Sequence, residues 1–429
     1  MLVNNYLCSS KQYVTCQLHC KLAKALCLKK MGDQRTILQE WLNKIQAELE
    51  SVVKFWTTHS HDVENGGFFN CLDKDGKVYD EIKYTWLQAR QVWMYCRLYV
   101  EVERFHTPDI LEAARNGADF LLEKCLIKQN GFTRCPFSVA KDGATIKVQR
   151  TMFAECFYVL AMSEMGRAST EEKYKVAARD MMRQIKHWCL VDTEGLGREN
   201  IPGSSFSASL AVPLMAYCVW EQMLTCEINW SDDAEVLQKW ALDKMLQHIQ
   251  RNGQHVLENV SDLGEELPGS AGRLQIPGHA IEGGWFLLQN AMMNKDKELA
   301  EKALTSFINK PFEQGWDKVN KGIFYFLDVE GYSPTQLEWN MKLWWPLNEA
   351  MIAFLMAYQY TADNSYLEKF QTVAEYTFAK FPDKQHGGWY GYLDNKGELT
   401  HRFKGGPWKG FFHVPRSLYM CEKILKKLL

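Results

Sequence analysis

No apolar run in this 429-residue chain approaches the ~20 residues that a membrane-spanning helix needs. An excess of either charge is also lacking, because 50 Lys and Arg oppose 52 Asp and Glu for a net charge of −2. Nucleic acid and anionic membranes are therefore not expected partners. The 13 cysteines are an odd number at no fixed spacing, which argues against a disulfide framework. We expect a soluble protein of the reducing cytoplasm.

Several motifs of well-known enzyme classes are also missing. The chain has no G-x-x-x-x-G-K-[ST] phosphate loop, no dinucleotide fingerprint, no H-E-x-x-H and no G-x-S-x-G elbow. Cys16, His19 and Cys20 lack a second pair of ligands, so we predict no metal site. The segment KGGPWKG (404–410) contains residue types that bind phosphate, but as an isolated run we interpret it as a loop.

A repeated pattern is the main feature that the chain does have. The pattern begins with glycine, continues through apolar and aromatic residues to Leu-Asp, and ends with two further residues and a second glycine. It occurs three times, as GFFNCLDKDG (67–76), GIFYFLDVEG (322–331) and GWYGYLDNKG (388–397). A weaker relative, CPFSVAKDG, ends at Gly143. Apolar residues that lead into Asp-x-x-Gly predict a strand and a tight turn, the start of a short β-hairpin.

Helical runs of two kinds alternate along the chain. Six are apolar nearly all round and predict buried helices: 84–100, 150–166, 208–224, 279–293, 343–360 and 409–426. Six are amphipathic and predict outer helices: 37–58, 107–125, 170–190, 232–252, 295–310 and 363–381. Equivalent positions in the inner series recur at 65, 60, 67, 67 and 67 residues: Arg90, Glu155, Met215, Glu282, Glu349 and Arg416.

This alternation predicts an all-α fold, an (α/α)6 barrel of six inner and six outer helices with hairpins at the N-terminal ends of the inner ones. An open superhelical solenoid is the alternative, but the near absence of polar capping repeats favours closure. We expect one catalytic domain over 35–429. Residues 1–34 lack strong periodicity and are interpreted as a poorly ordered N-terminal extension.

Two histidines occupy related positions in the repeat. His279 and His413 are 134 residues apart, twice the period of 67, and each lies just ahead of an apolar helical run. Parallel inner helices would bring both to one end of a central cavity. Two imidazoles that converge on one ligand suit chemistry that needs a proton base on each side of a carbon.

Charged residues accompany both histidines. Glu282 follows His279 by three residues, so both can lie on one helix face and the carboxylate can orient the imidazole. Arg416 takes the equivalent place after His413, so we expect His413 to pair with Glu349 from the neighbouring repeat. The two histidines should therefore differ in pKa. Arg90 lies in YTWLQARQVWMYC, where burial of a charge without a role would be costly.

Five segments carry a resemblance to a known family: NGGFF, KYTWLQARQVWMYCRLY, PGHAIEGGWFLL, PTQLEWNMKLWWPLNEAMIAFLMAY and FHVPRSLYMCE. They resemble the N-acylglucosamine 2-epimerase family, also called renin-binding protein, over about residues 35–429. The resemblance implies an (α/α)6 barrel, a homodimer, and interconversion of N-acetyl-D-glucosamine and N-acetyl-D-mannosamine in amino-sugar and sialic acid metabolism. It also implies ATP or a related nucleotide as an activator that is not consumed, and renin as a partner.

The family's functional residues match six positions of this chain. The resemblance implies that His279 and His413 are the acid/base pair, that Glu282 and Glu349 support them, and that Arg90 and Arg416 contact substrate. Relatives often have Cys where this chain has Phe411, so no thiol role is expected there. No motif of this chain matches a nucleotide site.

The hypothesis is a two-base proton transfer at C2 of the open-chain sugar, in which Arg90 or Arg416 stabilises the oxyanion. Aldose–ketose isomerisation is a related alternative on the same fold. Inverting glycoside hydrolysis would use Glu282 and Glu349 around a water but leaves the histidines unexplained. A non-catalytic role in binding renin is the remaining alternative.

Overall fold

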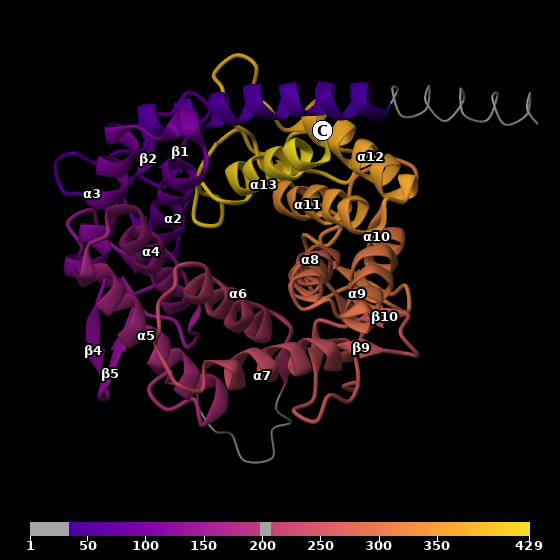
Figure 1. The fold of residues 1–429 in the computed structure, drawn as a ribbon, viewed down its shortest axis with the longest axis horizontal. Coiled ribbons are helices and arrows are strands. Elements are labelled where there is room, and N and C mark those ends of the chain that lie inside the picture. Colours follow the sequence, from indigo (N-terminus) through magenta and orange to yellow (C-terminus); the bar gives the residue numbers. More distant parts are fainter. Residues whose placement is uncertain (1–33, 198–206) are drawn as a thin grey trace, which may run out of the picture.

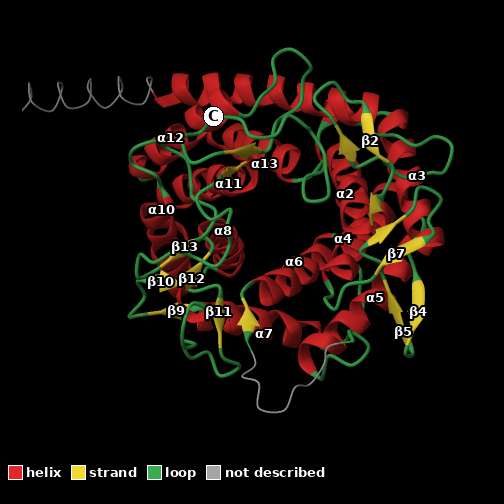
Figure 2. Cartoon of the chain, turned by 180° about the vertical axis from the view of Figure 1, so that it is seen from behind, coloured by secondary structure: helices red, strands yellow, loops and turns green. Residues whose placement is uncertain are grey.

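The fold is a closed ring of helices in two layers (Figures 1 and 2). A computed structural model describes residues 34–197 and 207–429; all but the last residue of the expected extension 1–34 lies outside them. The inner helices are α2 (Thr85–Glu101), α4 (Phe153–Ser169), α6 (Ala211–Thr225), α8 (Pro277–Asn294), α11 (Trp344–Thr361) and α13 (His413–Leu428). The outer layer comprises residues 34–59, α3 (Pro108–Lys124), α5 (Glu172–Leu190), α7 (Ala234–Gln247), α9 (Lys297–Lys302) with η3 (Ala303–Asn309) and α10 (Lys310–Gly315), and α12 (Asn364–Lys380). The predicted barrel of six inner and six outer helices is confirmed.

Burial follows the two kinds of helix that the sequence predicts. In α11, every residue from Trp344 to Ala357 is buried, as expected for a helix that is apolar all round. The outer helix α5 buries a single stripe with three- and four-residue spacing, formed by Tyr174, Ala178, Met181, Met182, Ile185 and Trp188. One apolar core fills the space between the layers and extends from Leu38 to Leu425. None of the helices in the described part of the chain has the length and apolarity required to cross a bilayer.

The repeated Leu-Asp pattern forms the predicted tight turns. The amide of the last glycine donates to the aspartate carbonyl at Gly76 (3.3 Å), Gly331 (2.9 Å) and Gly397 (3.1 Å). All three glycines have φ between 80° and 89°, a left-handed conformation that side chains with a Cβ rarely adopt. The pattern therefore needs glycine at its end for a steric reason.

Short antiparallel strands connect neighbouring repeats. Within or beside single repeats, β1 (Cys71–Leu72) pairs with β2 (Val78–Asp80), β4 (Ile127–Gln129) with β5 (Phe132–Arg134), β9 (Ile249–Gln250) with β10 (His255–Val256), and β6 (Ser138–Val139) with β7 (Thr145–Lys147). Between repeats, β3 (Lys83–Tyr84) pairs with β6, β8 (Ala208–Ser209) with β11 (Asn259–Val260), β12 (Leu274–Gln275) with β13 (Leu327–Asp328), and β14 (Lys342–Leu343) with β15 (Tyr392–Leu393). The first strand of each connecting pair leads directly or almost directly into an inner helix. These strands fix the N-terminal ends of the inner helices relative to one another.

The same kind of connection closes the ring. The Lys404 amide donates to the Leu72 carbonyl (2.8 Å) and the Leu72 amide donates to the Gly405 carbonyl (3.2 Å). The segment before the last inner helix thus pairs with the first hairpin, more than 330 residues away in sequence. This pairing excludes the open solenoid.

Three buried lysine–aspartate pairs reinforce the hairpin end. Their Nζ–Oδ2 distances are 2.8 Å for Lys83–Asp62, 2.7 Å for Lys342–Asp317 and 2.8 Å for Lys404–Asp383. Each ammonium also donates to a backbone carbonyl of another hairpin; for Lys404 this is the Lys74 carbonyl, 3.1 Å away across the closure. The Lys404 side chain is fully buried and Asp383 is 8% exposed. Lys404 therefore connects the last hairpin to the first, through its ion pair with Asp383 and its hydrogen bond to the Lys74 carbonyl.

We expect Lys404→Met to destabilise the fold by about 3 kcal/mol, because it leaves the Asp383 carboxylate buried without its cation. Urea unfolding monitored by circular dichroism measures this loss. The exposed Lys396 on the neighbouring turn is the matched control, and Lys396→Met should change the free energy of unfolding by less than about 0.5 kcal/mol. Equal stability of the two variants would show that the Lys404 pair does not hold the ring closed.

One outer segment differs from its prediction. The sequence predicts a single helix over 295–310, whereas the structure has α9, the π-helical η3 and α10 in succession to Gly315. Pro311 lies at the start of α10 and has no amide hydrogen to donate. A local change from α to π hydrogen bonding accommodates this loss and extends the helical segment by five residues.

Candidate functional site

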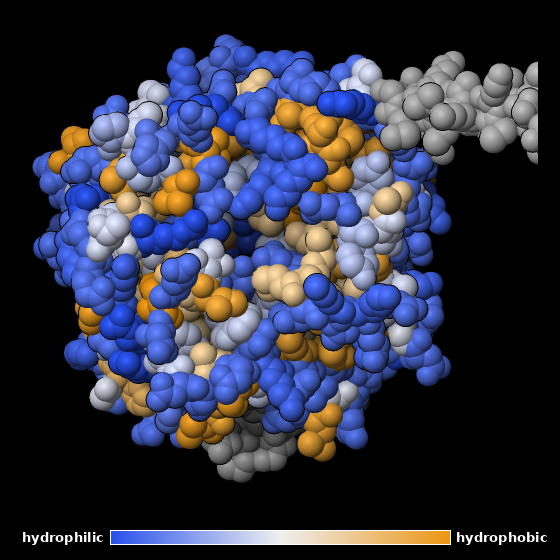
Figure 3. All heavy atoms as spheres, in the orientation of Figure 1, coloured by the Kyte–Doolittle hydropathy of each residue, from blue (hydrophilic) through white to orange (hydrophobic). Residues whose placement is uncertain are grey.

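The candidate site is a central cavity of about 710 Å³. The face of the molecule drawn in Figure 3 is hollowed near its centre, inside the ring of inner helices. Five of the six predicted site residues line the cavity: Arg90, His279, Glu282, His413 and Arg416. Glu349, the sixth, is fully buried behind the wall and is bonded to His413 and Arg416. The structure therefore brings the six residues together from α2, α8, α11 and α13.

Helix starts place both histidines. His279 is the third residue of α8 and His413 is the first residue of α13. Both pack against the Trp345 indole, whose ring centroid is 5.2 Å from that of His279 and 5.8 Å from that of His413. A Cβ on Gly278 would lie 2.5 Å from the same indole, so glycine permits α8 to approach it closely. The two imidazoles thus contact one aromatic ring, for which no sequence motif predicted a role.

His413 has the partner that the sequence predicts. Its Nδ1 lies 2.8 Å from Glu349 Oε1, and Arg416 Nη2 donates to the same oxygen at 2.6 Å. This geometry assigns the Nδ1 proton to the Glu349 bond and leaves Nε2 for the cavity. Because Arg416 compensates the charge of Glu349, the carboxylate orients the imidazole without forcing it to be protonated.

The partner predicted for His279 is wrong. His279 Nδ1 pairs with Glu258 Oε2 at 2.9 Å, whereas Glu282 accepts a hydrogen bond from Arg416 at 2.6 Å. Glu258 lies between β10 and β11, where its side chain accepts a hydrogen bond from the Ser209 hydroxyl at 2.8 Å. Because Arg416 binds Glu282 across the cavity, His279 pairs instead with Glu258, a carboxylate from a neighbouring hairpin. The only sequence signal for Glu258 is an acidic residue within the apolar context VLENV.

The two histidines differ in pKa, as predicted. Burial lowers the pKa of His279, but the facing Glu258 carboxylate outweighs this effect and raises the pKa above its ordinary value. Burial, together with the positive charges of Arg90 and Arg416, holds the pKa of His413 well below its ordinary value. These shifts favour a protonated His279, which can donate a proton, and a neutral His413, which can accept one.

Arg90 is a cation without an ion pair among the described residues. Its guanidinium lies over three rings, at 4.3 Å from Trp86, 4.1 Å from Phe157 and 4.6 Å from Phe412. Its Nε is buried and has no protein partner. Burial and the nearby Arg416 lower the pKa of Arg90 to about 9, which leaves it charged at neutral pH. The aromatic rings fix the guanidinium beside the cavity as a free donor to a ligand oxygen.

Arg416 supplies the positive charge between the carboxylates. Ligand atoms of Glu282, Glu349 and His413 lie within 4.8 Å of one another, a spacing that suits a metal ion. The Arg416 guanidinium, however, donates to both carboxylates at 2.6 Å, and these carboxylates hold its pKa above the ordinary value. The cluster is thus organised around a fixed side-chain cation.

The lysines of KGGPWKG have structural partners. Lys404 belongs to the ring closure, and Lys409 Nζ donates to the carbonyls of Trp389 and Lys404, both at 2.8 Å. Burial and the nearby Lys404 lower the pKa of Lys409 to about 7. Since both ammonium groups are directed into the protein, this segment does not fit a phosphate-binding loop, in agreement with its interpretation as a loop.

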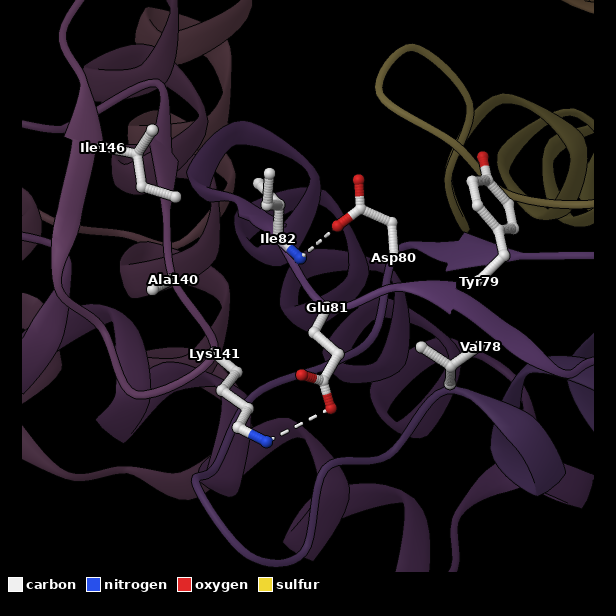
Figure 4. A pocket seen from close by; sticks show the side chains of 8 residues that line it. All are labelled: Val78, Tyr79, Asp80, Glu81, Ile82, Ala140, Lys141 and Ile146. Carbon is white, nitrogen blue, oxygen red and sulfur yellow. Dashed lines mark hydrogen bonds and ion pairs between the residues drawn. The ribbon is translucent and has the colours of Figure 1, made fainter.

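A second hollow, of about 580 Å³, lies on the surface between β2 and the turn around Lys141. Figure 4 shows its charged groups engaged with the protein itself: Glu81 and Lys141 form an ion pair at 3.2 Å, and Asp80 accepts a hydrogen bond from the Ile82 amide at 2.9 Å. It has neither of the histidines nor a free arginine. The central cavity is therefore the better candidate site.

Known proteins are similar to this chain over most of its length. The family model of N-acylglucosamine 2-epimerase (GlcNAc 2-epimerase) matches residues 67–417. The N-acylglucosamine 2-epimerase of Mus musculus is 50% identical over 399 residues, which cover 93% of this chain and 95% of the mouse protein.

Two solved structures share the fold. Cellobiose 2-epimerase from Bacillus thermoamylovorans has a TM-score of 0.77 at 19% identity and covers 91% of this chain and 100% of its own. A D-mannose isomerase has a TM-score of 0.75 at 17% identity and covers 90% of this chain and 98% of its own. The family match includes both histidines, and the similarity to the mouse protein covers most of the chain. The chain belongs to the N-acylglucosamine 2-epimerase family.

Proposed function

We propose that this protein interconverts N-acetyl-D-glucosamine and N-acetyl-D-mannosamine by moving a proton at C2. The observation that carries the proposal is the pair of imidazoles, His279 and His413, which line a single cavity, contact one indole and have pKa values shifted in opposite directions. Inversion at C2 needs a base on one face of the carbon and an acid on the other. The asymmetry comes from the Glu258 carboxylate, which raises the pKa of His279, and from burial and the charges of Arg90 and Arg416, which lower the pKa of His413.

The aldehyde of the open-chain sugar acidifies the proton on C2. In the direction that matches the favoured protonation state, His413 Nε2 removes this proton and His279 delivers one to the opposite face. The C1 oxygen becomes negatively charged in the enediolate-like intermediate, and Arg90, free of a carboxylate partner, donates hydrogen bonds to it. Glu258 and Glu349 hold the imidazole tautomers, while Arg416 holds Glu349. In the reverse direction the two histidines exchange roles.

Inverting glycoside hydrolysis fits the site less well. That reaction needs two carboxylates that flank a water molecule. Glu282 and Glu349 instead share one guanidinium nitrogen of Arg416, at 2.6 Å each. Their charges are engaged with the same cation, and neither is free to activate water.

The other properties that the family resemblance implies remain proposals. We infer a homodimer in the cytoplasm and activation by ATP or a related nucleotide, with renin as a partner. No residue of this chain is assigned to the nucleotide, and the reaction steps above do not involve it.

The direct test is incubation of the purified protein with N-acetylmannosamine, with and without ATP, followed by proton NMR of the anomeric signals. We expect N-acetylglucosamine to form, and D-mannose under the same conditions to give no ketose. Formation of fructose from mannose without epimerisation of N-acetylmannosamine would establish the isomerase alternative instead. Turnover of neither sugar, with or without ATP, would contradict the proposed function.

A further inference from the structure

The two arginines of the cavity share the nearby carboxylates unevenly. Arg416 Nη2 donates to both Glu282 and Glu349, at 2.6 Å each, whereas Arg90 forms no ion pair within the described part of the chain. Burial and the charge of Arg416 lower the pKa of Arg90 to about 9, and the charges of Glu282 and Glu349 oppose this shift. Both carboxylates are thus within electrostatic reach of Arg90. Because an unpaired buried charge is costly, a contact other than an ion pair must hold Arg90 in place.

One aromatic ring contacts both guanidinium groups. The Phe412 ring centroid lies 4.6 Å from the guanidinium carbon of Arg90 and 4.6 Å from that of Arg416. Among the described residues, no other ring has this contact with both arginines. The Phe412 side chain is buried and also makes a T-shaped contact with the His413 imidazole, with ring centroids 5.3 Å apart. Removal of the ring would leave open space beside both guanidinium groups.

A buried polar network fixes the residue that supports Phe412. The Trp93 ring packs against Phe412 with centroids 5.3 Å apart, and Trp93 Nε1 donates to Gln222 Oε1 at 2.9 Å. Gln222 also accepts a hydrogen bond from Arg97 at 2.9 Å and donates one to Glu164 at 2.7 Å. This network connects α2, α4 and α6. The Phe412 ring therefore packs against a side chain that is itself fixed by hydrogen bonding.

The face of an aromatic ring attracts a guanidinium, most strongly where water is excluded. We propose that Phe412 is a positioning residue, which holds the Arg90 guanidinium away from Glu282 and Glu349 and so keeps it free for the oxyanion of the substrate. This inference rests on the proposed function. Without the ring, we expect Arg90 to pair with Glu282, whose side chain is 14% exposed, whereas that of Glu349 is fully buried.

Kinetics of four variants test this role. Phe412→Leu should lower kcat by on the order of 10²-fold, the loss that follows when an oxyanion donor is withdrawn, and Phe412→Tyr, which retains the ring, should stay within about three-fold. In Arg90→Met the donor is already absent, so adding Phe412→Leu should cost less than about three-fold more. Phe411→Leu is the matched control, because this neighbouring ring is also buried but packs against Trp56 and Tyr95; it should leave kcat unchanged.

The pH profile of kcat/KM gives a readout that a loss of stability alone does not move. Burial lowers the pKa of His413, and the charges of Arg90 and Arg416 lower it further. Once Arg90 pairs with a carboxylate, its charge acts less on His413, whose pKa should rise. A base with a higher pKa becomes protonated at a higher pH, so the acidic limb should move to higher pH in Phe412→Leu and stay in place in Phe411→Leu. The charged and titratable groups that face His413 are Arg90, His279, Glu282, Glu349 and Arg416.

A crystal structure of Phe412→Leu tests the position of Arg90 independently of activity. We expect its guanidinium within about 4 Å of a carboxylate oxygen of Glu282 or Glu349. A guanidinium that stays over Trp86 without a carboxylate partner would overturn the inference. Phe412→Met lacks the ring but fills more of its volume, and it replaces Phe412→Leu in every measurement if that variant does not fold.

The outcomes separate this inference from the function on which it rests. If the unmodified enzyme does not epimerise N-acetylmannosamine, the proposed function fails, and the crystal structure still decides where Arg90 lies. If the unmodified enzyme is active, equal values of kcat in Phe412→Leu and Phe411→Leu overturn the role of Phe412. An acidic limb that does not move in Phe412→Leu, or losses that add in full in the double variant with Arg90→Met, overturn it as well.

Discussion

Replacing His413 with asparagine is expected to lower kcat for epimerisation by about 10²- to 10⁴-fold, and His279→Asn should do the same. Asparagine preserves a polar side chain of similar length but cannot exchange a proton at neutral pH. Because each direction of the reaction needs one histidine as base and the other as acid, either replacement should impair both directions. Initial rates from each epimer measure the effect.

A third histidine provides the control for this experiment. His401 also lines the cavity, but it is exposed and its Nδ1 pairs with the Thr400 hydroxyl at 2.9 Å. Lacking a carboxylate partner, it has no arrangement for proton transfer, and His401→Asn should retain kcat within about three-fold of the unmodified enzyme. Near-normal epimerisation by His279→Asn or His413→Asn, with loss in His401→Asn, would contradict the assignment.

Glu258→Gln should reduce kcat by on the order of 10²-fold, because the amide holds the imidazole of His279 less firmly in place. It should also change the pH profile. The Glu258 charge raises the pKa of His279; without it, burial lowers that pKa. An acid with a lower pKa loses its proton at lower pH, so the alkaline limb of the kcat/KM profile should move toward acidic pH.

Glu265→Gln is the matched control, since Glu265 is an exposed glutamate seven residues further along. It should leave both kcat and the pH profile unchanged. A Glu258→Gln enzyme that is slower but keeps the alkaline limb in place would show that Glu258 acts only on the shape of the site. A shift of the alkaline limb would identify Glu258 as the carboxylate that raises the pKa of His279.

The repeat made much of this architecture predictable. The 67-residue spacing assigns Glu282, Glu349 and Arg416 to equivalent levels of the ring, and the apolar or amphipathic character of each run separates inner from outer helices. The pairing of His413 with Glu349 follows from the same spacing, because adjacent repeats must be neighbours in space. These features depend on local pattern and period, which a single sequence contains.

Other features depend on how distant segments meet. Glu282 is three residues from His279 and close enough to orient it, yet Arg416 takes this carboxylate from across the cavity. Glu258 reaches His279 from a hairpin whose position is set by strand pairing and by Ser209. The period does not specify such choices between partners, because they depend on side-chain geometry and competing charges. Likewise, the contribution of Lys404 to the ring closure could not be predicted, because it depends on the contact between the first and last hairpins in the folded structure.

In the proposed mechanism, two bases act on opposite faces of C2. Epimerisation of N-acetylmannosamine in D2O to low conversion, with analysis of C2 by mass spectrometry and NMR, distinguishes two bases from one. We expect the N-acetylglucosamine formed to carry one solvent deuterium at C2, delivered by the second histidine, while unreacted substrate retains its protium. Product that retains the original C2 protium would mean that a single base removes and returns the same proton, and the two-base mechanism would be wrong.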